Sequence, residues 1–420
     1  MQSSIIPVIT GVGVVSPWGT GREIFFEGLK QARSAVRTIS FFNTDNFKCR
    51  VAGEVPDFHP EKYLPPDEVR RVPRLVSLGI AASQEAFEDA GVEVKNLSLE
   101  QQRQTAVVLG TGAGGIDFAE SQYEHFFRGD LRKATPYAIS SSFVGMLSSE
   151  ISIYFGLRGQ SHVISTGCTS SSDAIGYAAN LLREGKVERV LTGGIEACIT
   201  PAILAGFERM KVVSMAFNET PARASRPFNL DRDGFVLSEG AWVFLMESEQ
   251  SAKKRKAKIY GAVTGYGSTC DAYHRVRMEP TGEEPSRAMQ LAMDEACLRA
   301  EKIDYVNLHG TSTEMNDVTE TLALKRVFGN HSKDVWTSAT KSMAGHPQGA
   351  CGALGVAATL YGLTHQEIPP TINYENPDPR CDLNYTPNKP VRRAVQNALV
   401  NCLAFGSKNS ALVLERRDML

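Results

Sequence analysis

The stretch HVISTGCTSSSDAIGYAANLLR, residues 162–183, carries the clearest fold signal in the sequence. It predicts a strand over His162–Thr166, a tight turn at Gly167-Cys168, and then a helix whose apolar face carries Ala174, Ala178, Leu181 and Leu182. Cys168 would stand at the start of that helix, where free N–H groups and the helix dipole favour a thiolate. We therefore expect its pKa to lie below the usual value of about 8.5 and treat Cys168 as a candidate nucleophile. The alternative is a small buried thiol that only packs.

Composition excludes several classes of function. The chain has 420 residues, 42% of them hydrophobic, and a formal net charge of −2, whereas nucleic-acid-binding domains usually carry a basic surplus. Its eight cysteines are scattered without a CxxC pair, which indicates reduced thiols in a cytoplasmic protein. The longest weakly polar run, residues 349–363, is too short to cross a bilayer. We expect a soluble protein that binds neither nucleic acid nor membrane.

The chain repeats itself in four places that keep the same order. VITGVGVVS (residues 8–16) resembles AVTGYGSTC (262–270), TAVVLGT (105–111) resembles YVNLHGT (305–311), and AWVFLME (241–247) resembles ALVLE (411–415). The Gly167-Cys168 turn corresponds to Gly345-His346, each followed by a helix. These echoes predict two similar α/β halves, residues 1–255 and 256–420, and make His346 the counterpart of Cys168.

Two of the eight histidines stand in glycine-rich loops of the repeated unit. His309 ends an apolar strand and opens HGTSTEMND, and His346 lies in KSMAGHPQGACG. Ligand-binding loops gather at such strand ends, so we expect both rings near Cys168. The spacing of these three residues is not a zinc pattern and suggests no fourth ligand. A Cys-His-Asn hydrolase that uses Asn409 is an alternative.

Five motifs, TGCTSSSDA, RPFNLDRDGFVLSEGA, NLHGTSTEMNDVTE, KSMAGHPQGACGALG and FGSKN, occur in the order typical of one family. The chain resembles the β-ketoacyl-acyl-carrier-protein synthases, and within them the catalytic (alpha) ketosynthase subunit of bacterial type II polyketide systems. The resemblance implies the thiolase fold, with five αβαβα layers built from two duplicated halves. A fatty-acid condensing enzyme that acts as a homodimer is the alternative.

The same resemblance implies a role for each site residue. Cys168 would accept an acyl group from the phosphopantetheine of a carrier protein, and His309 and His346 would hold the malonyl thioester during decarboxylation. Further roles would belong to Phe405 (oxyanion hole and gate), Thr311 and Thr313 (pantetheine), and Lys341 paired with Glu320 (orientation of the histidines). No cofactor or metal is expected beyond the phosphopantetheine of the carrier protein.

Two positions depart from the family pattern. Gly355 stands where a glutamate is common, and Ser407-Lys408 replaces a second glycine after Phe405-Gly406. These departures leave a non-catalytic scaffold as a remote alternative. A thiolase, with Cys402 as its second catalytic cysteine, is a weaker one.

The resemblance also implies partners. An acyl carrier protein, which is typically acidic, would dock on Arg70, Arg71 and Arg74 at the start of a helix, together with Lys211. The catalytic subunit would pair with a silent chain-length factor. The insertions at residues 41–74 and 118–147 are the expected docking and dimer surfaces.

Overall fold

A computed structural model describes residues 5–417. The first half of the chain contributes five strands to the main sheet: β1 (Pro7–Ser16), β5 (Thr105–Gly110), β6 (Ser161–Ile164), β7 (Arg189–Glu196) and β9 (Gly240–Ser248). The second half contributes β10 (Gly261–Cys270), β11 (Tyr305–Asn307), β12 (Trp336–Ser338), β15 (Asn397–Ala404) and β16 (Lys408–Glu415). The short β2 (Gly19–Thr20) pairs with β1.

The two halves have the same strand order. Along the sheet the order is β12-β11-β15-β16-β10-β1-β9-β7-β5-β6, so each half runs third, second, fourth, fifth, first. In each half the fifth strand, β9 or β16, runs opposite to the other four. The halves join where β1 meets β10 over two residue pairs. This confirms the predicted duplication, although the division at residue 255 stays a prediction; residues 1–4 and 418–420 of those halves lie outside the described part.

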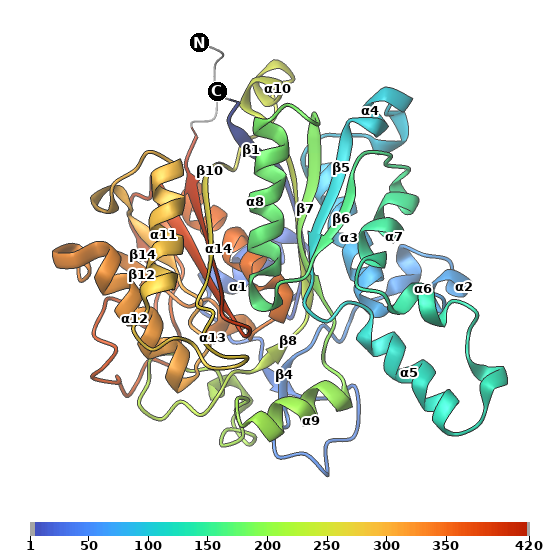
Figure 1. Cartoon of the computed structure of the whole chain (residues 1–420), viewed down its shortest axis with the longest axis horizontal. Coiled ribbons are helices and arrows are strands. Elements are labelled where there is room, and N and C mark those ends of the chain that lie inside the picture. The colour runs from blue at the N-terminus through green and yellow to red at the C-terminus, as the bar shows by residue number, and fades with distance from the viewer. Residues whose placement is uncertain (1–4, 418–420) are drawn as a thin grey trace.

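Helices complete five layers (Figure 1). α8 (Ser170–Arg183) and α14 (Cys351–His365) pack against each other between the two halves of the sheet. The outer face of the first half carries α3 (Arg74–Asp89) and α7 (Met146–Phe155), and that of the second carries α11 (Glu283–Glu295) and α12 (Glu314–Phe328). The predicted αβαβα architecture is therefore confirmed. Because α8 lies between layers, it is buried almost all round rather than on one face.

The repeated Thr-Gly-x-Gly motif has a packing cause. A Cβ on Gly11 or Gly13 would lie 2.0 or 1.8 Å from a carbonyl oxygen of α3, and one on Gly265 or Gly267 would lie 1.9 or 2.1 Å from a carbonyl of α11. Only glycine allows a strand to approach a helix so closely. The register of each strand also shifts at the first glycine. In both halves, therefore, two glycines of the first strand allow the outer helix to pack closely against it.

The remaining elements connect these layers. The other α-helices are α1 (Arg22–Lys30), α2 (Pro66–Val69), α4 (Leu99–Arg103), α5 (Ile116–Phe127), α6 (Ala138–Ser142), α9 (Pro201–Met210), α10 (Glu249–Lys254) and α13 (Lys341–Ala344). The minor strands are β3 (Arg37–Thr38), β4 (Val51–Gly53), β8 (Leu237–Ser238), β13 (Glu367–Ile368) and β14 (Val391–Arg392). Among residues 5–417, no helix is both long and apolar enough to span a bilayer.

Candidate active site

Cys168 lies where the sequence predicts it, in a short 3₁₀ turn, η4 (Gly167–Thr169), that leads into α8. Gly167 has φ +72°, a left-handed conformation that glycine adopts without strain. The corresponding turn in the second half is η8 (Gln348–Ala350), which leads into α14. By this spacing the position of Cys168 is taken by Gly349, so the prediction that His346 is its counterpart is off by three residues.

The structure nevertheless brings the two predicted histidines to the sulfur. One donor atom each from Cys168, His309 and His346 lies within 4.8 Å of the others, and all three residues are buried. The two imidazole rings are perpendicular, with centroids 5.3 Å apart. No fourth His, Cys, Asp or Glu joins this group in the described part of the chain. The cluster therefore offers one nucleophile and two polar rings around a common point.

Both imidazoles are neutral at pH 7. Burial lowers the pKa of His309 and of His346 well below the usual 6.5, and the nearby Lys341 ammonium lowers each further. A neutral imidazole has one N–H group, so it can donate a hydrogen bond although it carries no net charge. The rings are thus suited to stabilise an oxyanion.

The expected low pKa of Cys168 is wrong. Burial raises the pKa of its thiol to about 12, while Lys341 and the backbone N–H of Phe405 act in the opposite direction. The helix dipole favours the thiolate, but the layers on both sides enclose the turn and desolvate it, which a sequence does not show. Removing the thiolate from water disfavours it more than the dipole favours it.

Lys341 and Glu320 do not form the predicted ion pair. The Glu320 carboxylate accepts hydrogen bonds from the backbone N–H groups of His309 (2.7 Å) and Gly310 (2.8 Å) and from the side chain of Asn401 (2.7 Å). Burial raises its pKa to about 7, and Lys341 counters this only as a nearby charge. Glu320 therefore fixes the backbone that carries His309. Asn401 was missed, although a polar residue inside the apolar run of β15 is a usable signal.

A cavity of about 110 Å³ opens onto this cluster. Cys168, His309, His346 and Phe405 line it with both predicted threonines, Thr311 and Thr313, whose hydroxyls are 2.9 Å apart. A second hollow of about 650 Å³ shares Val212, Thr313 and Met315 with the first and is also lined by Lys211 and Arg380. The two hollows therefore adjoin at Thr313, and the inner one, whose lining is mostly apolar, reaches the Cys168 sulfur.

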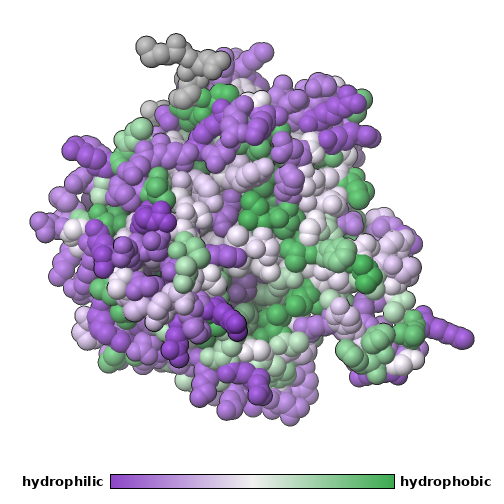
Figure 2. Space-filling model, viewed as in Figure 1, coloured by the Kyte–Doolittle hydropathy of each residue, from purple (hydrophilic) through white to green (hydrophobic). Residues whose placement is uncertain are grey.

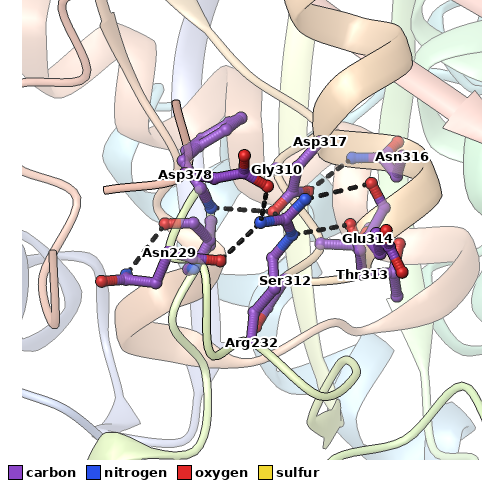
Figure 3. A network of polar contacts seen from close by, with 12 residues as sticks. Asn229, Arg232, Gly310, Ser312, Thr313, Glu314, Asn316, Asp317 and Asp378 are labelled. Carbon is purple, nitrogen blue, oxygen red and sulfur yellow. Dashed lines mark hydrogen bonds and ion pairs between the residues drawn. The ribbon is translucent and has the colours of Figure 1, made fainter. Parts of the chain in front are cut away.

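The loop that carries the two threonines is held by a buried arginine (Figure 3). The Arg232 guanidinium lies 2.8 Å from Asp378 and 3.2 Å from Asp317, and it donates to the backbone oxygens of Thr313 (3.2 Å) and Glu314 (3.1 Å). This gives the motif RPFNLDRDGF a local role that the sequence analysis did not assign. The two carboxylate partners of Arg232 lie far away in the sequence, so no local pattern marks this buried network.

Ser407 joins the turn after Phe405 to the neighbouring loop 271–277. It takes the left-handed conformation, with φ +65°. Its hydroxyl donates to the carbonyl of His274 (2.9 Å) and accepts from the N–H groups of Tyr273 (3.3 Å) and His274 (3.2 Å). Val276 and Arg277 of the same loop line the cavity. Serine in place of glycine at position 407 thus adds hydrogen bonds to a loop that lines the cavity.

Close packing explains why position 355 is a glycine. A Cβ at this position would lie 2.8 Å from the Asn307 side-chain oxygen and 2.9 Å from Val400. The glutamate that is common in the family does not fit here unless these neighbours move. No carboxylate therefore reaches Lys341 from this position.

Two alternative chemistries lose their key residues. Asn409 donates to Asp271 (2.6 Å) and Thr269 (3.3 Å) instead of a histidine, so the Cys-His-Asn arrangement is absent. Cys402 is buried with its sulfur 3.9 Å from that of Cys351, and it does not line the cavity. Neither residue is placed for a hydrolase or a thiolase.

The four predicted docking residues differ in their availability. Arg70 and Lys211 are exposed. Arg71 forms an ion pair with Glu68, one turn away. Arg74 is tied into the fold, because its guanidinium lies 2.8 Å from the buried Glu239 carboxylate. Arg74 thus has a structural partner, and its docking role stays a prediction. Only Arg74 begins a helix, since Arg70 and Arg71 follow α2 in the connection to α3.

Comparison with known proteins agrees with this geometry. Residues 7–252 match the model of the β-ketoacyl synthase N-terminal domain, and residues 260–375 match that of the C-terminal domain. The chain therefore belongs to the β-ketoacyl synthase family.

Its relatives include both polyketide and acyl-carrier-protein synthases. It is 38% identical over 409 residues to 3-oxoacyl-[acyl-carrier-protein] synthase 2 of Synechocystis sp., covering 97% of each chain. It is also 38% identical over 416 residues to the tetracenomycin polyketide synthase ketoacyl synthase alpha subunit of Streptomyces glaucescens, covering 97% of this chain and 96% of the relative.

A solved structure, the ishigamide ketosynthase/chain length factor, superimposes with a TM-score of 0.91 at 33% identity, covering 99% of this chain and all of that one. The thiolase fold is thereby confirmed, and the chain is an acyltransferase of the ketosynthase class. Its reaction is the β-ketoacyl synthase condensation.

Proposed function

We propose that the chain is the condensing subunit of a type II polyketide system, working on acyl groups carried by an acyl carrier protein. The observation that carries the condensing activity is that Cys168, His309 and His346 lie within 4.8 Å of one another and line one cavity. The motifs STGCTS, ASRPF and NPDPRCDLNY support the polyketide branch.

The chemistry follows from the three groups. The Cys168 sulfur attacks the thioester carbonyl of the acyl-carrier protein, and the pantetheine thiol leaves with the proton. Malonyl-carrier protein then binds, its carboxylate departs as carbon dioxide, and the released electron pair forms an enolate. The enolate carbon attacks the Cys168 thioester, and the sulfur leaves as thiolate. The product is a β-ketoacyl chain two carbons longer on the carrier.

The two neutral histidines stabilise the enolate oxygen. Each donates one hydrogen bond in a site that largely excludes water, where one such donor is typically worth about 3 kcal/mol to a transition state. Burial lowers the pKa of both rings and keeps them neutral, and the nearby Lys341 charge acts in the same direction. Thr311 and Thr313 bind the pantetheine arm along the cavity, and Phe405 gates its inner end.

Arg70 and Lys211 are the docking residues for the carrier protein. Both are exposed, and Lys211 lines the outer hollow that adjoins the cavity. A cation at this hollow attracts an acidic carrier protein toward the cavity. Phosphopantetheine on that carrier is the only prosthetic group that the reaction requires.

A second subunit covers the surface of α5, α6 and α7. Large apolar side chains are exposed there, among them Phe127 (80%), Ile139 (70%) and Ile153 (74%). The right-hand side of Figure 2, where Figure 1 places these helices, shows the apolar side chains gathered on one face. The neighbouring β6 is an edge strand of the main sheet. Exposed apolar side chains gathered on one side in this number favour an interface, and we propose a chain-length factor as the subunit that binds there.

The second candidate is a fatty-acid condensing enzyme that works as a homodimer, favoured by the identity to the Synechocystis synthase.

An elongation assay distinguishes the two candidates. Purified alone, the polyketide condensing subunit should load acyl groups on Cys168 but elongate malonyl-carrier protein poorly. Adding its partner subunit should restore elongation. Robust elongation by the chain alone would favour the homodimer, and absence of an acyl adduct would favour the scaffold.

A further inference from the structure

Gln348, which lies in the motif KSMAGHPQGACGALG but was given no role, contacts the nucleophile. Its Oε1 lies 3.8 Å from the Cys168 sulfur, within the range of a hydrogen bond donated by a thiol. Its Nε2 is buried and has no hydrogen-bond partner among the described residues. A buried amide with one end on the sulfur and the other end unpaired is costly unless the free end is used.

The backbone holds this side chain at the sulfur. Gln348 has φ +39°, in the left-handed region that a residue with a Cβ seldom occupies. The next N–H, of Gly349, donates to the Glu196 carboxylate (2.9 Å), and that of Ala350 donates to the Pro347 carbonyl (2.8 Å). A strained backbone conformation that neighbouring hydrogen bonds hold in place is typical of a residue with a functional side chain.

A carboxamide is suited to both protonation states of a thiol. Its oxygen accepts a hydrogen bond from S–H, and its NH₂ group donates to S⁻. Half a rotation about the last side-chain bond exchanges the two ends without displacing other atoms. Deprotonation of Cys168 would therefore turn the unpaired Nε2 toward the sulfur.

We propose that Gln348 is a further catalytic residue, which accepts a hydrogen bond from the Cys168 thiol and, after rotation of its amide, donates one to the thiolate that attacks the acyl thioester. This inference rests on the proposed role of Cys168. The buried thiolate receives no hydrogen bonds from water, and the hydrogen bond from Gln348 replaces part of that lost stabilisation. Other charged or titratable groups near the sulfur are His309, His346, Lys341, Glu196, Cys351 and Cys402.

The test is the pH dependence of Cys168 alkylation by iodoacetamide, followed by mass spectrometry of the peptide that contains it. Q348L should lower the alkylation rate about tenfold at a fixed pH below the thiol pKa. Q348E should lower it further, because a carboxylate cannot donate and repels the thiolate. The exposed thiols of Cys270 and Cys297 serve as internal references whose rates should not change.

Each outcome decides the inference. If Q348L and the wild type share one pH profile, or Q348E alkylates as fast as the wild type, the proposal is overturned. If Gln348 had only a structural role, Q348L would lower the midpoint of thermal unfolding and leave the pH profile of Cys168 alkylation unchanged. Alkylation needs no carrier protein or condensation. A Gln348-dependent profile in a chain that takes no acyl group from acyl-carrier protein onto Cys168 would therefore refute the proposed function and keep this inference.

Discussion

Replacing Arg232 with methionine should destabilise the protein strongly and weaken substrate binding. The Arg232 side chain is only 1% exposed and faces the Asp317 and Asp378 carboxylates, both fully buried. Removing one partner of a buried ion pair typically costs about 3–5 kcal/mol, because the other charge stays in a medium that solvates it poorly. The expected loss in free energy of unfolding is of that size.

The structure says which carboxylate causes most of the loss. Asp378 keeps an ion pair with Arg380 at 2.7 Å, whereas Arg232 is the only cation paired with Asp317 among residues 5–417. The double variant R232M/D317N should therefore recover part of the stability that R232M loses, and R232M/D378N should recover less. Urea unfolding of the four proteins measures these differences.

Activity gives a second reading of the same network. Arg232 holds the backbone of Thr313, so R232M should raise KM for a pantetheine thioester more than it lowers the rate of Cys168 alkylation. A loss of stability below about 1 kcal/mol, or equal recovery by D317N and D378N, would refute the account of this buried pair.

Three other outcomes are expected. Because the histidine pKa values are lowered in the folded protein, the unfolded chain takes up protons first as the pH falls below about 6.5. Stability should then fall by about 1.4 kcal/mol per pH unit for each of His309 and His346, and the slope should shrink in H309N/H346N. S407G should destabilise less than S407A, since glycine suits φ +65°, while both speed hydrogen exchange in loop 271–277. R70E should raise KM for carrier-bound substrates at low salt and leave KM for free pantetheine thioesters unchanged.

Local pattern was sufficient to predict the duplicated fold. The glycines of Thr-Gly-x-Gly recur because each half must seat a helix against its first strand, and this constraint leaves a mark in the sequence. The strand, glycine turn and helix around Cys168 are likewise local. His309 and His346 could be placed because strand ends of such sheets face one side.

The features that the sequence could not show depend on contacts between distant segments. Arg74 resembles a surface arginine until Glu239, 165 residues away, is placed beside it. The Glu320 carboxylate is taken by backbone N–H groups, which a sequence does not display as partners. The pKa of Cys168 follows from burial on all sides, which only the packed layers reveal.

The central claim is that Cys168 carries the growing chain while His309 and His346 activate malonyl-carrier protein. Its most direct measurement is mass spectrometry of the protein after incubation with acyl-carrier protein, followed by addition of malonyl-carrier protein together with the partner subunit. The account predicts an acyl adduct on Cys168, absent in C168A and present in the matched variant C351A. It also predicts that the adduct is discharged as a chain two carbons longer, a step lost in H309N and H346N. An adduct on another residue, or discharge that survives loss of both histidines, would contradict it.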